Sequence, residues 1–220
     1  IVSRDWSSDV CSSDLGALQN INTPDKKIIT IEDPVEYQIR GINQIHVKPQ
    51  IGLDFASGLR SIVRQDPDVI MVGEIRDAQT ADVAIQAALT GHLVFSTVHT
   101  NDAAGAITRL LDMGVENYLI SSALLGILAQ RLVRVICRTC IEPIEVAPAL
   151  IAEIDNPDQD SIKAFHGKGC NKCNHTGFRG RAGIYELLVV DDSVRQLILT
   201  KATSQTIRES ARKKGMTTLR

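Results

Sequence analysis

Four cysteines stand in two pairs that have the spacing of metal ligands. Two residues separate Cys137 from Cys140, and two separate Cys170 from Cys173. This spacing brings both sulfurs of a pair to one point, and two such pairs complete the tetrahedral set that structural zinc sites use. Four buried structural cysteines or one redox-active pair are the alternatives, but the double CxxC pattern favours zinc. We therefore expect a structural rather than a catalytic zinc site.

Acidic side chains follow two apolar runs of the chain. Glu74 comes after one run, and Glu32 and Asp33 end another, with Glu36 close behind. Carboxylates at neighbouring strand ends repel one another unless a cation or a basic ligand lies between them. In nucleotide hydrolases such acids hold magnesium or polarise the attacking water. The alternative is a set of solvated loop acids.

Two histidines flank a third apolar run. His92 and His99 are an odd number of residues apart, so along an ideal strand their side chains face opposite sides. His99 lies among Thr97, Thr100 and Asn101, which are polar groups suited to sensing a terminal phosphate. We expect His99 to be the functional histidine and His92 to pack or cap.

Five arginines are candidates for phosphate contacts. Arg60 and Arg64 are four residues apart on one predicted helix face, and Arg181 follows the second cysteine pair. Arg131 and Arg134 close an apolar stretch that we interpret as a helix, where positive charge suits the carboxyl end. Each guanidinium can reach a phosphate, including one bound by an adjacent subunit, or can simply be solvated.

The elements that position these residues alternate between strand and helix. Such alternation predicts a mostly parallel sheet covered by helices, with ligands outside the carboxyl ends of the strands. All three predicted strands end in the acids or the histidine described above. We expect strands at residues 26–34, 68–74 and 92–99, and helices at 55–65, 79–89, 103–113, 118–135, 193–199 and 204–214.

Composition excludes several classes of protein. The 220 residues are 44% apolar and 23% charged, with a formal net charge of −2, as in ordinary globular proteins. The charge balance and an aromatic content of 4% argue against a nucleic-acid translocase, which needs a basic stripe with interleaved aromatics. No apolar run reaches the roughly 18 residues that span a bilayer. The paired cysteines suit a reducing compartment, which indicates the cytoplasm.

Four motifs occur together in the order of one known family. ITIEDPVEYQI resembles its aspartate box, RQDPDVIMVGEIRD its Walker B segment, TGHLVFSTVHTND its histidine box, and the CxxC pairs its tetracysteine zinc element. From about Gly16 to Arg220 the chain resembles the C-terminal ATPase domain of the secretion ATPases of type II secretion and type IV pilus assembly (the GspE/PilB type). The resemblance implies an α/β fold with a RecA-like P-loop NTPase core, a small zinc subdomain and C-terminal helices.

The resemblance also implies roles for the acids and for His99. Glu74 would be the catalytic Walker B glutamate, with Glu32, Asp33 and Glu36 handling magnesium and water. His99 would link the nucleotide site to conformational change.

For the arginines, the resemblance implies contacts with phosphates. Arg60 and Arg64 would be directed at a neighbouring subunit's phosphates, and Arg181 is a weaker candidate. The implied cofactors are ATP, Mg²⁺ and Zn²⁺.

The family works as a homo-hexamer in the cytoplasm, docked on inner-membrane platform proteins, with no nucleic acid involved. The segments AAGAITRLLDMGVE and LLGILAQRLVRVIC resemble the type II secretion branch more closely than the pilus branch.

One family motif is absent from the sequence. No GxxxxGK[ST] occurs in the 220 residues, so no phosphate-binding loop of that form cradles the β- and γ-phosphates. At its place stands SRDWSSDVCSSDL, and Asp5–Leu15 read like a translated sequencing adapter. We therefore expect this chain to be inactive alone. We expect four parts: an adapter artefact at 1–15, a partial ATPase core at 16–135, a zinc subdomain at 136–183 and a truncated helical subdomain at 184–220.

Three functions remain open at this point. The first is the ATP-hydrolysing motor of type II secretion, which powers pseudopilus assembly and protein export. The second is the assembly ATPase of type IV pili. The third is a zinc-stabilised scaffold module that does not hydrolyse ATP.

Overall fold

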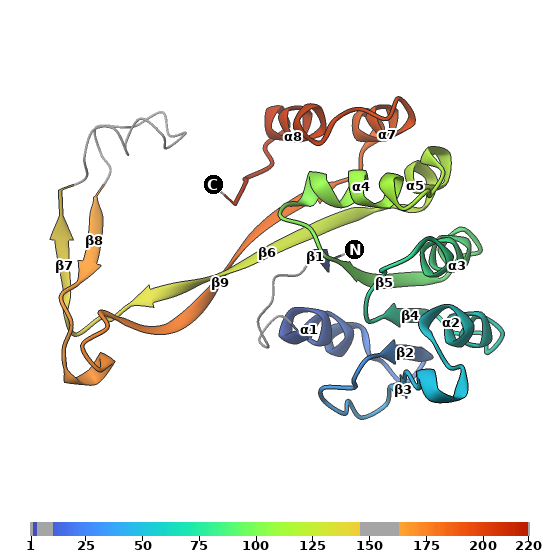
Figure 1. Ribbon diagram of the computed structural model, residues 1–220, viewed down its shortest axis with the longest axis horizontal. Helices are drawn as coiled ribbons and strands as arrows, with labels where there is room; N and C mark the ends of the chain where they lie inside the picture. Colours follow the sequence, from blue (N-terminus) through green and yellow to red (C-terminus); the bar gives the residue numbers. More distant parts are fainter. Residues whose placement is uncertain (1, 4–10, 146–162, 220) are drawn as a thin grey trace. The chain divides into compact units, whose positions relative to one another are not determined.

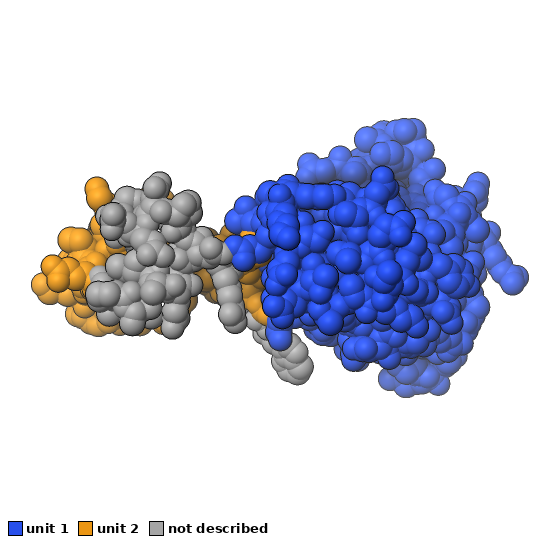
Figure 2. Space-filling view, turned by 90° about the horizontal axis from the view of Figure 1, so that it is seen from above, with its two compact units in different colours: residues 1–130, 186–217 blue, residues 131–185, 218–220 orange. Residues whose placement is uncertain are grey.

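The computed structural model describes residues 2–3, 11–145 and 163–219, which fall into two compact units (Figures 1 and 2). Unit 1 contains residues 1–130 and 186–217, and unit 2 contains residues 131–185 and 218–220. The C-terminal helices, expected as a separate subdomain, belong to unit 1. Residues 1, 4–10, 146–162 and 220, which include parts of the predicted adapter and zinc segments, lie outside the described residues.

A seven-stranded sheet is the framework of the fold. Its order is β3-β2-β4-β5-β1-β6-β9, and the ladders from β3 through β6 are parallel. The parallel ladders confirm the expected α/β fold. The strands are β1 (Val2–Ser3), β2 (Ile28–Glu32), β3 (Asn43–His46), β4 (Val69–Val72), β5 (Leu93–Val98), β6 (Gly126–Ile136) and β9 (Phe178–Val189).

The strand β1 occupies the position between β5 and β6, although it has only two residues. Val2 pairs with Thr97 on one side and Leu128 on the other, and Ser3 pairs with Val98 and Ala129. Longer stretches of both neighbours therefore lie beyond its pairing.

Helices cover both faces of the sheet in unit 1 (Figure 1). Leu18 packs with Val69 and Met71 on the face that α1 covers, and α2 and α3 contact the opposite face. The residues of β2 and β4 are all buried, as expected for strands covered on both faces. The helices of unit 1 are α1 (Cys11–Ile21), α2 (Phe55–Val63), α3 (Ala78–Leu89), α4 (Ala103–Asp112), α5 (Asn117–Ala123), α7 (Asp192–Leu199) and α8 (Ser204–Lys213), with a 3₁₀ turn η1 at Pro49–Ile51.

Aspartates fix where three of these helices begin. The side chains of Asp54, Asp77 and Asp102 accept hydrogen bonds from backbone N–H groups three residues later, at the starts of α2, α3 and α4. Each helix follows a loop from the carboxyl end of a strand or from η1. These caps therefore determine where the preceding loops end.

The prediction of a helix over residues 118–135 is wrong. The helix α5 ends at Ala123, and residues 126–136 form β6. A leucine-rich apolar run of this length does not distinguish a buried helix from a buried strand by its periodicity. Gly126 marks the change, because a Cβ there would lie 3.2 Å from the Leu188 carbonyl of β9. Arg131 and Arg134 therefore lie on a strand, and Arg134 stacks over the Phe178 ring, 4.0 Å from its centroid.

The helices predicted at 193–199 and 204–214 are present as α7 and α8, although the expected helical segment 184–220 begins with the end of a strand. Residues 184–189 complete β9, and the helices begin at Asp192.

Unit 2 contains a second, smaller sheet. The strands β7 (Ile141–Ile144) and β8 (Ala164–Gly167) pair antiparallel, and a 3₁₀ turn η3 (Asn171–Cys173) follows. Within the described part of the chain, no helix combines the length and apolar character needed to cross a bilayer.

Candidate functional site

Glu74 lies just beyond the carboxyl end of β4, and only 5% of it is exposed. Its Oε2 accepts a hydrogen bond of 2.6 Å from Arg76 Nε and lies 3.2 Å from His99 Nε2. The sequence predicted that Glu74 and His99 serve one site, and the structure places them in contact. Neither contact uses Glu74 Oε1.

The backbone that presents Glu74 is held from β5. Thr97 Oγ1 donates to the Gly73 carbonyl at 2.6 Å, and the Ile75 N–H donates to the Thr97 carbonyl at 2.9 Å. A Cβ on residue 73 would lie 3.2 Å from the Ile31 carbonyl and 3.3 Å from the Glu32 Cα. Glycine precedes Glu74 because the end of β4 runs this close to β2.

Arg76 joins two of the predicted acids. Its guanidinium is paired with Glu74, and Asp33 adds a weaker Coulombic attraction. Together these raise the pKa of Arg76 against a smaller opposing effect of burial. Sequence reasoning missed Arg76. The signal was a cation two residues after Glu74, because close carboxylates require a basic partner.

Glu32 has a structural network of its own. Its buried Oε1 accepts hydrogen bonds from Thr30 Oγ1 at 2.5 Å and from Gln44 Nε2 at 3.1 Å. Gln44 also donates to the Tyr37 carbonyl at 2.9 Å, so the network fastens the loop between β2 and β3. Glu36 is exposed on that loop, whereas Glu74 contacts Arg76 and His99.

The acids do not form a ready metal cluster. Within the described residues, the four cysteines are the group of histidine, cysteine or acidic side chains whose ligand atoms lie within 4.8 Å of one another. Glu32, Asp33, Glu36 and Glu74 are not brought together in this way.

The other histidine of the pair, His92, caps a helix. Its Nδ1 lies 2.9 Å from the Ala87 carbonyl and 3.2 Å from Thr90 Oγ1, at the carboxyl end of α3. His92 therefore caps, as the sequence led us to expect.

Arg60 and Arg64 lie away from Glu74. They line a hollow of about 210 Å³ between α2 and α3, together with Gln86 and Thr90 near the end of α3. Both helices end shortly before the next strand begins, so this hollow is at the amino end of the parallel strands, opposite the edge that carries Glu74. Arg181 is exposed in unit 2.

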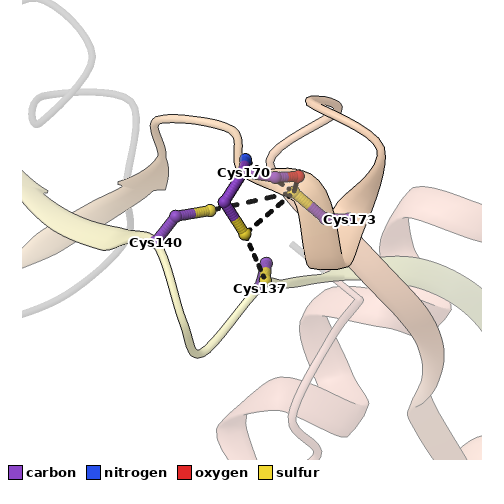
Figure 3. A group of neighbouring side chains, drawn as sticks. All are labelled: Cys137, Cys140, Cys170 and Cys173. Atoms are coloured by element: carbon purple, nitrogen blue, oxygen red, sulfur yellow. Dashed lines mark hydrogen bonds between the residues drawn. The ribbon is translucent and has the colours of Figure 1, made fainter.

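The four cysteine sulfurs of unit 2 converge on one point (Figure 3). The Sγ–Sγ distances are 3.9 Å for Cys137–Cys170, 3.9 Å for Cys140–Cys173 and 3.8 Å for Cys170–Cys173. Four sulfurs around a tetrahedral zinc, at Zn–S distances of about 2.3 Å, lie about 3.8 Å apart. The donor set and its spacing fit zinc.

Hydrogen bonds from backbone N–H groups lower the pKa of two of the four cysteine thiols. The Cys170 N–H donates to Cys173 Sγ at 3.2 Å, and this hydrogen bond is the main reason why the pKa of Cys173 falls to about 6. A hydrogen bond from the Thr139 N–H lowers the pKa of Cys137, whereas burial raises that of Cys140 to about 12. Metal binding requires thiolates, so zinc binding releases the remaining protons.

Comparison with known proteins identifies the family. A sequence model described as "Type II/IV secretion system protein" matches residues 15–220. The chain belongs to this family. Within it, the chain is 53% identical over 195 residues to "Type II secretion system ATPase E" of Vibrio cholerae, covering 89% of this chain and 39% of that protein. It is 54% identical over 205 residues to "Type IV pilus assembly ATPase PilB" of Thermus thermophilus, covering 92% of this chain and 23% of that protein.

Solved structures agree with the secretion family fold. The pilus retraction motor PilT, crystallised with ADP, matches with a TM-score of 0.65 and 29% identity, over 99% of this chain and 58% of that one. The ATPase DotB of Yersinia pseudotuberculosis matches in fold, with a TM-score of 0.68 at 24% identity, over 96% of this chain and 49% of that one. The chain therefore spans less than two thirds of the length of each of these relatives.

Proposed function

We propose that this chain is part of the catalytic domain of the ATP-hydrolysing motor of a type II secretion system. That motor powers pseudopilus assembly and protein export. The observation that carries the proposal is the buried Glu74, presented at the carboxyl end of β4 and held against Arg76 and His99. Family membership and the similarity to a type II secretion ATPase support the same activity.

In this proposal Glu74 orients and deprotonates the attacking water through Oε1, because Oε2 is engaged by Arg76 and His99. His99, whose side chain is 45% exposed, senses the terminal phosphate and reports it through Glu74. Asp33, Glu36 and Glu74 would help to hold Mg²⁺, with Glu32 keeping the β2 end in place. When bound, Mg²⁺ would neutralise charge on the β- and γ-phosphates.

Arg60 and Arg64 serve a neighbouring subunit in this proposal. Their position at the edge opposite Glu74 suits contact with another copy's phosphates better than contact with the chain's own site. The proposal therefore includes a homo-hexamer on the cytoplasmic side of the inner membrane, docked on platform proteins, with Arg181 as a weaker phosphate contact. The four cysteines hold a structural Zn²⁺.

Two other functions compete with this one. The assembly ATPase of type IV pili is supported by the 54% identity to a pilus ATPase. A zinc-stabilised scaffold module without hydrolysis would follow if the absence of a GxxxxGK[ST] motif is native.

The deciding experiment uses a chimera, termed here the secretion chimera, in which residues 16–220 replace the matched segment of the V. cholerae ATPase. We expect it to release phosphate from ATP and to restore protein secretion in a strain that lacks that ATPase. The 220-residue chain alone should release negligible phosphate in the same assay. Robust turnover by this chain would contradict that expectation.

Variants of the secretion chimera test the role of Glu74. Glu74→Gln should lower kcat by about 100-fold or more, since a general base contributes on this scale. Glu116→Gln removes an exposed carboxylate at the start of α5 and serves as the matched control. An inactive chimera, or a Glu74→Gln chimera with full activity, would reject the motor function and favour the scaffold.

An equivalent chimera built on the PilB ATPase tests the pilus alternative. If it restores pili while the secretion chimera fails to restore secretion, the pilus branch is favoured.

A further inference from the structure

The loop from His99 to Asp102 joins β5 to α4 and sets the position of the His99 imidazole. At its first residue, His99 Nε2 lies 3.2 Å from Glu74 Oε2. At its last residue, Asp102 Oδ1 accepts the Gly105 N–H at 2.7 Å and so caps α4. Thr100 Oγ1 donates to the Asp102 carbonyl at 3.1 Å, within the loop. The place of the imidazole therefore depends on where the start of α4 is held.

Glu186 holds the start of α4 from β9. Its Oε1 accepts the Ala103 N–H at 2.9 Å, although the two residues are 83 positions apart in sequence. Glu186 is only 2% exposed. A buried carboxylate is costly unless hydrogen bonds stabilise its charge, and the amino end of a helix does so through its N–H groups and dipole. The contact therefore ties α4 to the point at which the chain re-enters unit 1.

Arg208 holds the same point from α8. Its guanidinium forms an ion pair with Asp102 Oδ2, the oxygen that does not cap the helix. The side chain of Arg208 is 36% exposed and that of Asp102 25%, so the pair is partly shielded from water. The helices α4 and α8 also pack against each other.

Both contacts converge on two adjacent residues, three and four positions after His99. We propose that Glu186 and Arg208 are positioning residues for His99, through which the C-terminal strand and helix control the histidine loop. The catalytic consequence rests on the proposed ATPase function. The effect on the position of the histidine loop does not rest on that function. Position and catalysis are therefore measured in separate experiments.

Hydrogen–deuterium exchange of the 220-residue chain tests the position of the loop. Arg208→Ala should raise the exchange rate of amides in residues 99–106 about fivefold, because a charge-assisted contact at Asp102 is lost. Asp102→Asn keeps a good helix cap but removes the charge, and should have the same effect. The double variant should exchange no faster than either single variant, since both remove one contact.

A matched control separates this effect from a general loss of stability. Lys213→Ala removes an exposed cation from the same helix and should leave exchange in residues 99–106 unchanged. Glu186→Gln keeps an acceptor for the Ala103 N–H. Its exchange rate in residues 99–106 should therefore lie between that of the wild-type chain and that of Arg208→Ala. Unchanged exchange in Arg208→Ala, or an equal rise in Lys213→Ala, would overturn the proposal.

Kinetics of the secretion chimera test the consequence for catalysis. Arg208→Ala should lower kcat about tenfold with KM for ATP unchanged, because a displaced histidine affects the reacting geometry rather than ground-state binding. Arg208→Lys should recover part of the loss. A rise in KM at constant kcat would overturn the positioning role. An inactive parent chimera would reject the proposed function, and the exchange experiment would still decide whether the loop is held.

Discussion

At the scale of single residues, two glycines decide whether the cysteine site can form. A Cβ at Gly167 would lie 2.0 Å from the Gly177 carbonyl oxygen, and one at Gly177 would lie 2.3 Å from the Gly167 carbonyl oxygen. The Gly177 carbonyl in turn accepts the Cys137 N–H at 2.9 Å. The segments before and after the second cysteine pair therefore meet at a contact that admits no side chain, and a backbone hydrogen bond joins this contact to Cys137.

The first prediction concerns this contact. Gly177→Ala should abolish stoichiometric zinc binding, because it adds a clash to a backbone with φ of +76°. Metal analysis of the purified, reduced protein measures the loss. Gly180→Ala has nearly the same φ, +81°, but open space around its Cβ, so it should cost only about 1–2 kcal/mol and retain zinc. Zinc retained by Gly177→Ala would show that the contact is not required.

The residues that sequence reasoning found and missed differ in a physical way. The cysteine cluster was predictable from the spacing of the two pairs, and the meeting of Glu74 with His99 from the place of each after a predicted parallel strand, whereas their catalytic roles come from the family resemblance. Arg76 was missed although it contacts Glu74, and Thr97 was not recognised as a support for the Gly73 carbonyl. Supporting residues are chosen by tertiary geometry, which leaves little trace in local sequence.

At the scale of elements, α7 begins at a carboxylate with several partners. Asp191 Oδ2 accepts from Lys214 Nζ at 2.6 Å, and Oδ1 accepts the Val194 N–H at 3.0 Å and the Ser193 hydroxyl at 2.8 Å. These hydrogen bonds, that of Lys214 foremost, hold the pKa of Asp191 well below its ordinary value of 3.8. The cap thus joins the start of α7 to the end of α8.

The second prediction follows from the sign of this shift. The stabilisation by Asp191 is complete above the unfolded pKa of 3.8 and is lost as pH falls through the lower folded pKa. Thermal melts should therefore show Asp191→Asn less stable than the wild type at pH 7, with the gap closing below pH 3.8. Asp192→Asn removes a charge from the same turn and is the control. A gap that widens towards acid would contradict the assignment.

The elements themselves were predictable where capping and periodicity agree. The helices α2, α3, α4, α7 and α8 and the strands β2, β4 and β5 lie within about two residues of the predicted ranges. The strand β6 was not predictable, because only its place between β1 and β9 makes the apolar run a strand. Short strands such as β3, with a mixed burial pattern, carry no strong signal of their own.

At the scale of the whole molecule, unit 2 has few buried apolar groups in its small sheet. Ile141, Ile144 and Phe165 are each close to half exposed. Little hydrophobic burial is therefore available to stabilise β7 and β8. We expect metal binding to supply the stabilisation that hydrophobic burial does not, as it does in other small metal-dependent folds.

The third prediction is that the two units lose structure separately. The chain should bind about one zinc, and a strong chelator should unfold unit 2 while unit 1 remains folded. Hydrogen–deuterium exchange should rise at residues 137–144 and 164–177 and stay low in β2, β4 and β5. Re-addition of zinc to reduced protein should reverse the change. Loss of protection in both units at once would show that their folding is coupled.

The route of the chain between the units bears on how such a protein evolves. The chain leaves unit 1 along β6 and returns along β9, and these two strands are neighbours in the sheet. Where β6 begins and β9 ends, the Val190 N–H donates to the Leu125 carbonyl. Neighbouring strands are about 5 Å apart, so a tight hairpin turn would bridge the same two points. Unit 2 is thus related to unit 1 as an insertion into a hairpin. A lineage can enlarge, replace or delete such an insert without altering the order of any strand in the host sheet.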